Sequence, residues 1–210
     1  MRSKPLALVI PAMLLAAGAK AREPDDGQAA EVTNPVVRVE RAPDGRGVQV
    51  DIDMLVEAPL ETIERMVRDV ERWPDWIPNM KQVAIDESDV DDPKHIPAFA
   101  TLVDLPWPLH DVSATLLMSR SPTCDGGIRL AWAQMRGDLR RNEGSWTLYP
   151  RGQKARVVYR ANFQLGVWLP TFLVRRAGEH QAPKFIENMR RRAAIMAGPS
   201  MSTASVPHAG

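Results

Sequence analysis

The segment 59–78 constrains the fold more than any other stretch of the chain. Its apolar side chains recur at helical spacing and predict an amphipathic helix with one buried face: Leu60, Ile63, Val67 and Val70. Pro59 suits the first helical turn, and Pro74 predicts that the helix ends near Trp73. Trp73 and Trp76 then need burial against a large apolar surface. The segment therefore predicts a helix and a packing loop that cover another layer of structure.

Eight stretches of the remaining sequence alternate apolar with polar residues, the pattern of strands that bury one face. Short turns separate most of them, as in an antiparallel sheet. We expect the first two to pair as a hairpin, and we expect a charged turn over 137–142. The predicted strands cover residues 36–40, 48–56, 81–86, 99–105, 112–119, 128–136, 144–148 and 155–164.

A long helix is predicted over 170–196, with an apolar stripe opposite a basic side. Pro183 is expected to kink this helix or to divide it in two. A twisted sheet with one apolar face needs a covering layer, and this is the late element long enough to supply it. A helix that crosses a curved sheet leaves volume beside it, which either large side chains or a ligand fill. The sequence leaves both possibilities open.

Several short motifs accompany this order of elements: A-P-L-E-T-I at 58–63, R-D-V-E-R-W-P-D-W-I-P-N-M at 68–80, L-P-W-P at 105–108, G-S-W-T-L-Y-P at 144–150, A-R-V-V-Y-R-A at 155–161 and L-P-T-F-L at 169–173. Together they resemble the START-like SRPBCC superfamily, with its polyketide cyclase, coenzyme-Q-binding and lipid-transfer branches. The resemblance implies an α+β helix-grip fold. In that fold a curved antiparallel β-sheet wraps around a long C-terminal α-helix and encloses an apolar cavity.

The resemblance further implies a hydrophobic small-molecule ligand, such as a lipid, sterol-like molecule, quinone or polyketide, bound for carriage or transfer. Aromatic and methionine side chains suit such a ligand. Ordinary core packing is the alternative for each candidate residue, most of all for Trp146. The three candidates on the final helix, Phe172, Phe185 and Met189, are expected to face the cavity. The candidates are Met80, Trp107, Trp132, Trp146, Tyr159, Phe172, Phe185 and Met189.

Two other functions stay open: a cyclase or aromatase of the same superfamily, and a protein-interaction domain with a filled core. The sequence holds no nucleophile elbow, H-E-x-x-H zinc motif, Walker loop or dinucleotide-binding glycine run. His110 beside Asp111 is a weak catalytic candidate, because adjacent residues on a strand point to opposite faces. We expect a binding protein without a cofactor rather than an enzyme.

Residues 1–21 have the pattern of a secretory signal peptide. Arg2 and Lys4 precede an apolar stretch, and Ala19-Lys20-Ala21 forms a small-x-small cleavage site. An uncleaved membrane anchor is the alternative. We expect cleavage after Ala21 and a periplasmic or secreted protein. The expected organisation is a signal peptide over 1–21, a linker over 22–35, a START-like domain over 36–197 and a disordered tail over 198–210.

Loss of that signal peptide lowers Lys plus Arg from 27 to 24 against 26 Asp plus Glu, a net charge of about −2. This balance argues against nucleic acid as a partner, which requires a concentrated basic surface.

Cys124 is the one cysteine of the sequence, so an internal disulfide and a cysteine-cluster zinc site are excluded. We expect a monomer without a metal. Transient membrane contact competes with plain solvation as the role of the basic residues Arg175, Arg176 and 190–192.

Overall fold

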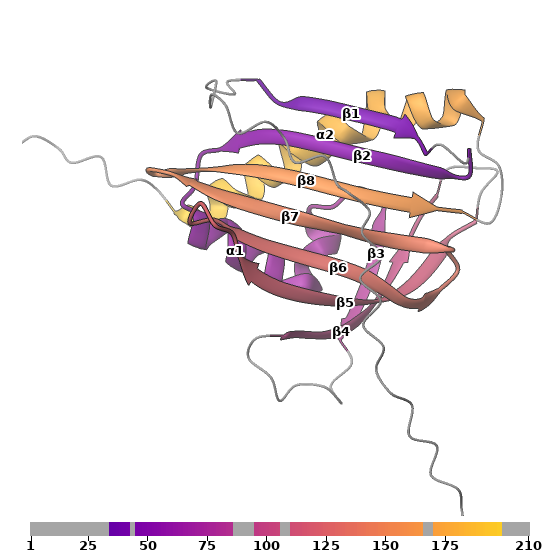
Figure 1. Ribbon diagram of the computed structural model, residues 1–210, viewed down its shortest axis with the longest axis horizontal. Coiled ribbons are helices and arrows are strands. Elements are labelled where there is room, and N and C mark those ends of the chain that lie inside the picture. Colours follow the sequence, from indigo (N-terminus) through magenta and orange to yellow (C-terminus); the bar gives the residue numbers. More distant parts are fainter. Residues whose placement is uncertain (1–33, 43–44, 86–94, 106–109, 166–169, 199–210) are drawn as a thin grey trace, which may run out of the picture. The chain divides into compact units, whose positions relative to one another are not determined.

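The computed structural model describes residues 34–42, 45–85, 95–105, 110–165 and 170–198 of the 210-residue chain. The chain divides into two units after residue 31, and all of the described residues belong to the second. Their elements are eight β-strands, two α-helices and one short 3-10 helix (Figure 1). None of the helices in these ranges has the length and apolar character needed to cross a membrane. The same ranges hold no cluster of acidic, histidine or cysteine side chains suited to a metal ion.

One curved antiparallel sheet forms the frame of the domain, in the order β1-β2-β8-β7-β6-β5-β4-β3 (Figure 1). The sheet is open, with β1 and β3 at its edges. The predicted hairpin of the first two strands is confirmed, because Val39 of β1 pairs with Val50 of β2. The strands are β1 (Val36–Arg41), β2 (Gly47–Val56), β3 (Met80–Ile85), β4 (His95–Val103), β5 (Val112–Pro122), β6 (Ile128–Gly137), β7 (Arg141–Arg151) and β8 (Lys154–Gln164).

The two faces of the sheet separate as the alternation predicts. Ile52 and Met54 of β2 are buried, whereas Asp51 and Asp53, which alternate with them, face outward. Asp53 forms an ion pair of 2.6 Å with Arg156 on β8. A sheet with one apolar and one charged face is typical of antiparallel architecture covered on a single side.

Two strands begin well before the residue that the pattern predicts. β7 begins at Arg141, inside the segment expected to be a turn, and β4 begins at His95 rather than at Phe99. Arg141 is exposed but still pairs with Gln164 of β8. Residues 141–143 are all polar, so they give no apolar–polar alternation to read, although Asn142 is buried.

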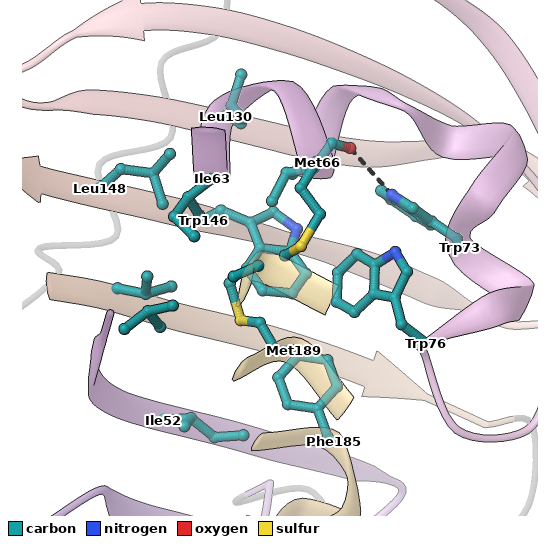
Figure 2. Packing of buried hydrophobic residues seen from close by; sticks show 14 of the residues in the cluster. Ile52, Ile63, Met66, Trp73, Trp76, Leu130, Trp146, Leu148, Phe185 and Met189 are labelled. Carbon is teal, nitrogen blue, oxygen red and sulfur yellow. Dashed lines mark hydrogen bonds between the residues drawn. The ribbon is translucent and has the colours of Figure 1, made fainter. Parts of the chain in front are cut away.

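The helix predicted over 59–73 consists of two elements, α1 (Leu60–Arg68) and the 3-10 helix η1 (Val70–Asp75). The chain leaves α-helical geometry at Asp69, and Pro74 lies inside η1 instead of ending the helix. The expected burial of both tryptophans is confirmed, at 4% exposure for Trp73 and 2% for Trp76. The indole N–H of Trp73 donates to the carbonyl of Val67 at 2.9 Å, which ties η1 back onto α1 (Figure 2).

The second helix, α2 (Thr171–Ala197), runs without interruption through Pro183, so the expected division in two is wrong. A proline removes one backbone hydrogen bond from a helix. Pro183 is exposed, and buried residues flank it on the covered side of the helix, including Ala182 and Phe185. Packing on both sides of the proline therefore holds the helix together. In Figure 1 α1 and α2 lie on the same side of the sheet.

Candidate functional site

A cavity of about 350 Å³ lies between the buried face of the sheet, η1 and α2. Its volume is near the lower end of the roughly 300–1,000 Å³ typical of small-molecule pockets. No acidic, basic or histidine side chain of the described residues lines it. Aliphatic side chains from the strands make up much of the wall, among them Val48, Val50, Ile52, Val103, Val112 and Leu116.

One row of paired residues divides the solid part of the core from the hollow part. In this row Ile52, Tyr159 and Trp146 lie side by side on β2, β8 and β7. On the side nearer the β7–β8 turn, large side chains fill the space against α1, as Leu148 and Met66 do in Figure 2. On the opposite side lies the cavity.

Small side chains account for the open volume on that opposite side. Ala114 of β5 and Ala182 of α2 contribute only a methyl group to the lining, and Thr101 of β4 is little larger. The Thr101 hydroxyl also donates to the carbonyl of Ala114 at 3.2 Å, so it is satisfied within the wall. A larger side chain at any of these positions would project into the cavity.

Four aromatic rings form one end of the cavity. The Tyr159 ring lies 4.5 Å from the Trp146 ring and 5.1 Å from the Phe185 ring, measured between centroids. It also stacks on Trp132, with centroids 5.6 Å apart and planes inclined by 22°. Figure 2 shows Phe185 of α2 and Trp146 of the sheet in this packing, with Trp76, the residue that follows η1, beside them. Aromatic contacts of this kind make a stiff wall.

The Trp132 indole is fixed from two sides. Its N–H donates to the side-chain oxygen of Asn142 at 3.0 Å. Its ring lies directly over Gly144, where any Cβ atom would collide with the indole and with the carbonyl of Arg160. Glycine is therefore needed at this position for close approach rather than for an unusual backbone angle. The cavity wall is preorganised here before any ligand binds.

Tyr159 and Gln181 bring polar atoms to a largely apolar lining, in addition to Thr101 and Asn142. Tyr159 keeps part of its surface accessible, although burial raises the pKa of its hydroxyl far above the ordinary value of 10.0. Tyr159 is among the residues that line the cavity. Among the described residues the side-chain oxygen of Gln181 is buried without a hydrogen-bond partner. The lining thus holds polar groups that stay neutral at physiological pH.

Five of the eight candidate residues line the cavity: Met80, Trp132, Trp146, Tyr159 and Phe185. Trp146 is at the same time part of the core, at 1% exposure. Trp107 lies outside the described residues. Contact of any of these side chains with a ligand stays a prediction.

Two candidates on α2 do not line the cavity, contrary to expectation. Phe172 is 64% exposed. It precedes Phe185 by 13 residues, which at about 100° per residue places it roughly 140° away around the helix. Val174, 11 residues before Phe185, returns to within about 20° and does line the cavity. Met189 is fully buried but packs in the solid core beyond Phe185 (Figure 2).

The sequence reading missed the polar lining residues Thr101, Asn142 and Gln181. A signal was present for each. Thr101 is in phase with the buried Phe99 along β4, and Gln181 precedes Phe185 by one helical turn. Asn142 is in phase with Trp146, but its placement in a predicted turn concealed this relation.

The weak catalytic candidate, His110, is exposed and is not part of the cavity lining. Its neighbour Asp111 pairs with Lys81 at 2.8 Å, and this hydrogen bond lowers the pKa of the Asp111 carboxyl. Of the basic residues on α2, Arg190 donates to the carbonyl of Leu55 at 3.2 Å. Membrane contact through these residues stays a prediction.

An open antiparallel sheet, a long C-terminal helix and an apolar cavity between them define a START-like domain that binds hydrophobic ligands. The sequence agrees with this class. Residues 56–190, well over half of the chain, match the family model described as "Polyketide cyclase / dehydrase and lipid transport", and the chain belongs to this family. The resemblance inferred from the motifs is thereby confirmed. Comparison with curated proteins gives no match.

Solved structures share this fold. One is the fragment 25–204 of a STAR-related lipid transfer protein from Xanthomonas axonopodis, with a TM-score of 0.64 and 16% identity over 79% of this chain and 96% of that one. Another is human StAR-related lipid transfer protein 5, at 0.63 and 14%, covering 76% and 81%. The Zhui aromatase/cyclase from Streptomyces sp. R1128 matches at 0.51 and 16%, covering 70% and 93%. At these identities the likeness shows the fold, and it confirms the predicted helix-grip architecture.

Proposed function

We propose that this protein binds one hydrophobic small molecule in the cavity and carries it without changing it chemically. The observation that carries the proposal is an apolar cavity of about 350 Å³ with no charged side chain among its described lining residues. Removal of apolar surface from water supplies roughly 25 cal/mol for each Å² that the ligand buries. The family description and the lipid transfer proteins of the same fold support a carrier.

Catalysis finds little support in the cavity. General acid–base chemistry uses a group whose pKa lies near the working pH. Tyr159 is the titratable side chain in the described lining, and burial moves its pKa away from neutrality. The aromatase/cyclase of the same fold keeps the enzymatic alternative open to a direct test.

Export before binding is a second element of the proposal. Its support is the sequence of residues 1–21, a basic start, an apolar stretch and the Ala19-Lys20-Ala21 site. A periplasmic or extracellular carrier would meet its ligand at or between membranes. A neutral apolar molecule is poorly soluble there without a protein that encloses it.

Native mass spectrometry of full-length protein expressed with its N-terminus and recovered from the periplasmic fraction tests both elements. We expect a polypeptide that begins at Arg22 and one adduct per chain. The bound compound is extracted with organic solvent and incubated for a prolonged time with fresh protein. We expect its mass to stay unchanged. Acceptor vesicles should remove it from the complex.

The outcomes separate the alternatives. A compound of altered mass after incubation would favour the cyclase. A ligand-free protein that takes up nothing from lipid, quinone or polyketide extracts would contradict carriage. Protein that stays in the cytoplasm with residues 1–21 uncleaved would contradict the export element of the proposal but not the carriage of a ligand.

A further inference from the structure

Two polar residues of the cavity lining, Gln181 and Tyr159, are each linked to Phe185 of α2. Gly178 of α2 lies against Val39 of β1, since a Cβ atom at Gly178 would come within 3.0 Å of the Val39 Cβ. Val39 is in register with Val50 and, one strand further, with Ala161 of β8. Two turns along α2 the Phe185 ring lies 5.1 Å from the Tyr159 ring.

Gln181 stands between these two contact points on α2. It precedes Phe185 by one helical turn, so the two side chains are neighbours on the same helix face. Gln181 and Tyr159 both line the cavity, Gln181 from α2 and Tyr159 from β8. Because Phe185 neighbours Gln181 along α2 and its ring lies 5.1 Å from the Tyr159 ring, both polar residues lie near the Phe185 end of the cavity.

These polar groups have unused hydrogen-bonding capacity. Within the described residues the Gln181 side-chain oxygen and the Trp146 indole N–H are buried without partners. Burial raises the pKa of Tyr159, which lines the same cavity. An unpartnered buried polar group costs about 1–3 kcal/mol. A polar group on a ligand would offset that cost, whereas a pure hydrocarbon would not.

The lining also limits the charge of the ligand. An ionised carboxylate or phosphate needs a counter-charge when it is taken out of water. Among the described residues the cavity offers none. Asp, Glu, Lys and Arg lie instead on the outer face of the sheet, where Asp51 pairs with Arg160 at 3.3 Å.

We propose that the cavity selects a compact neutral ligand that carries one hydroxyl or carbonyl group, held between the Tyr159 hydroxyl and the Gln181 carboxamide. The inference rests on the proposed function and gives its ligand a chemical class. A hydroxyl donates to the Gln181 oxygen and accepts from Tyr159. For a carbonyl, Tyr159 donates, and a rotated Gln181 amide supplies the second donor.

Three naphthalene derivatives of one shape test this proposal: 2-naphthol, 2-methylnaphthalene and 2-naphthoate. Their affinities for the delipidated wild-type protein are measured by equilibrium dialysis. Tyr159→Phe removes the hydroxyl, and Gln181→Met keeps the length of the side chain without its amide. We expect each variant to bind 2-naphthol about tenfold more weakly. Neither should weaken binding of 2-methylnaphthalene, because that probe makes no hydrogen bond.

Tyr149→Phe is the matched control, since Tyr149 lies outside the lining and contacts Arg156 at 5.8 Å from its ring centroid. It should leave all three affinities unchanged. At neutral pH 2-naphthoate should bind wild-type protein at least about tenfold more weakly than 2-naphthol, because its carboxylate has no counter-charge.

Equal losses for 2-naphthol and 2-methylnaphthalene in the two variants would overturn the inference and leave carriage intact. So would 2-naphthoate that binds as tightly as 2-naphthol. Wild-type protein that binds none of the probes would contradict the proposed function itself. Circular dichroism of each variant establishes that the fold is retained.

Discussion

Asn142 holds the Trp132 indole in place within the cavity wall. The residue is buried at 9% exposure, and its side-chain oxygen accepts the indole N–H at 3.0 Å. The same indole stacks on Tyr159. A polar residue on the buried face of β7 therefore sets the position of the aromatic ring that the ligand would meet.

Replacing Asn142 with leucine should lower the free energy of unfolding by about 1–3 kcal/mol, because the buried indole N–H loses its acceptor. Urea denaturation measures the loss. Trp132→Phe removes the donor, so the leucine change should cost less in the Trp132→Phe background than in wild-type protein. Strictly additive effects of the two changes would contradict this role of the hydrogen bond.

At this scale the sequence predicted the residues whose neighbours repeat a clear period. Trp132, Trp146 and Tyr159 lie on strands, where a period of two assigns each side chain to a face. Phe172 shows the limit of that reading on a helix. An apolar residue near a helix end can face either the sheet or the solvent. Which of the two it faces depends on which turns of the helix contact the sheet.

Contacts between elements explain why the turn after β6 holds its position. Asp138 accepts from both the backbone N–H and the hydroxyl of Ser113 on β5, at 2.6 and 2.8 Å. The Asp138 N–H in turn donates to the Ser113 carbonyl at 2.9 Å. These hydrogen bonds to its ionised form lower the pKa of Asp138 from the ordinary value of 3.8.

The sign of the resulting pH dependence follows from that shift. A carboxyl with a lower pKa in the folded state stabilises the fold above its unfolded pKa and loses this effect as the pH falls through the folded value. Asp138→Asn should therefore reduce the urea midpoint near about pH 7 and make little difference near about pH 2. A difference of the same size at both pH values would contradict the assignment.

The elements themselves were largely predictable, and the exceptions share a physical cause. α2 continues through Pro183 and η1 continues through Pro74 because each segment packs against the sheet. Local rules treat proline as a helix breaker, but tertiary packing can exceed the cost of one lost hydrogen bond. β7 also begins earlier than predicted, because its first residues pair with the backbone of β8.

For the whole molecule, the sequence predicted the curved antiparallel sheet, the covering helix and the family. It did not decide between a hollow and a solid core. That outcome depends on Ala114, Thr101 and Ala182, which are small residues from two paired strands and from α2 that face one volume. The periodicity of a single element assigns side chains to a face, but it does not predict the volume that remains between several elements.

The measurement that tests the central claim most directly is binding of the neutral fluorescent probe N-phenyl-1-naphthylamine before and after the cavity is filled. Ala182→Trp places an indole into the cavity from α2, whereas Ala194→Trp adds the same side chain on the exposed side of the helix. We predict that wild-type protein and Ala194→Trp bind one probe with equal affinity. Folded Ala182→Trp should bind it at least about tenfold more weakly, since overpacking removes the space. Undiminished binding by folded Ala182→Trp would show that the apolar ligand is held elsewhere and would contradict the account.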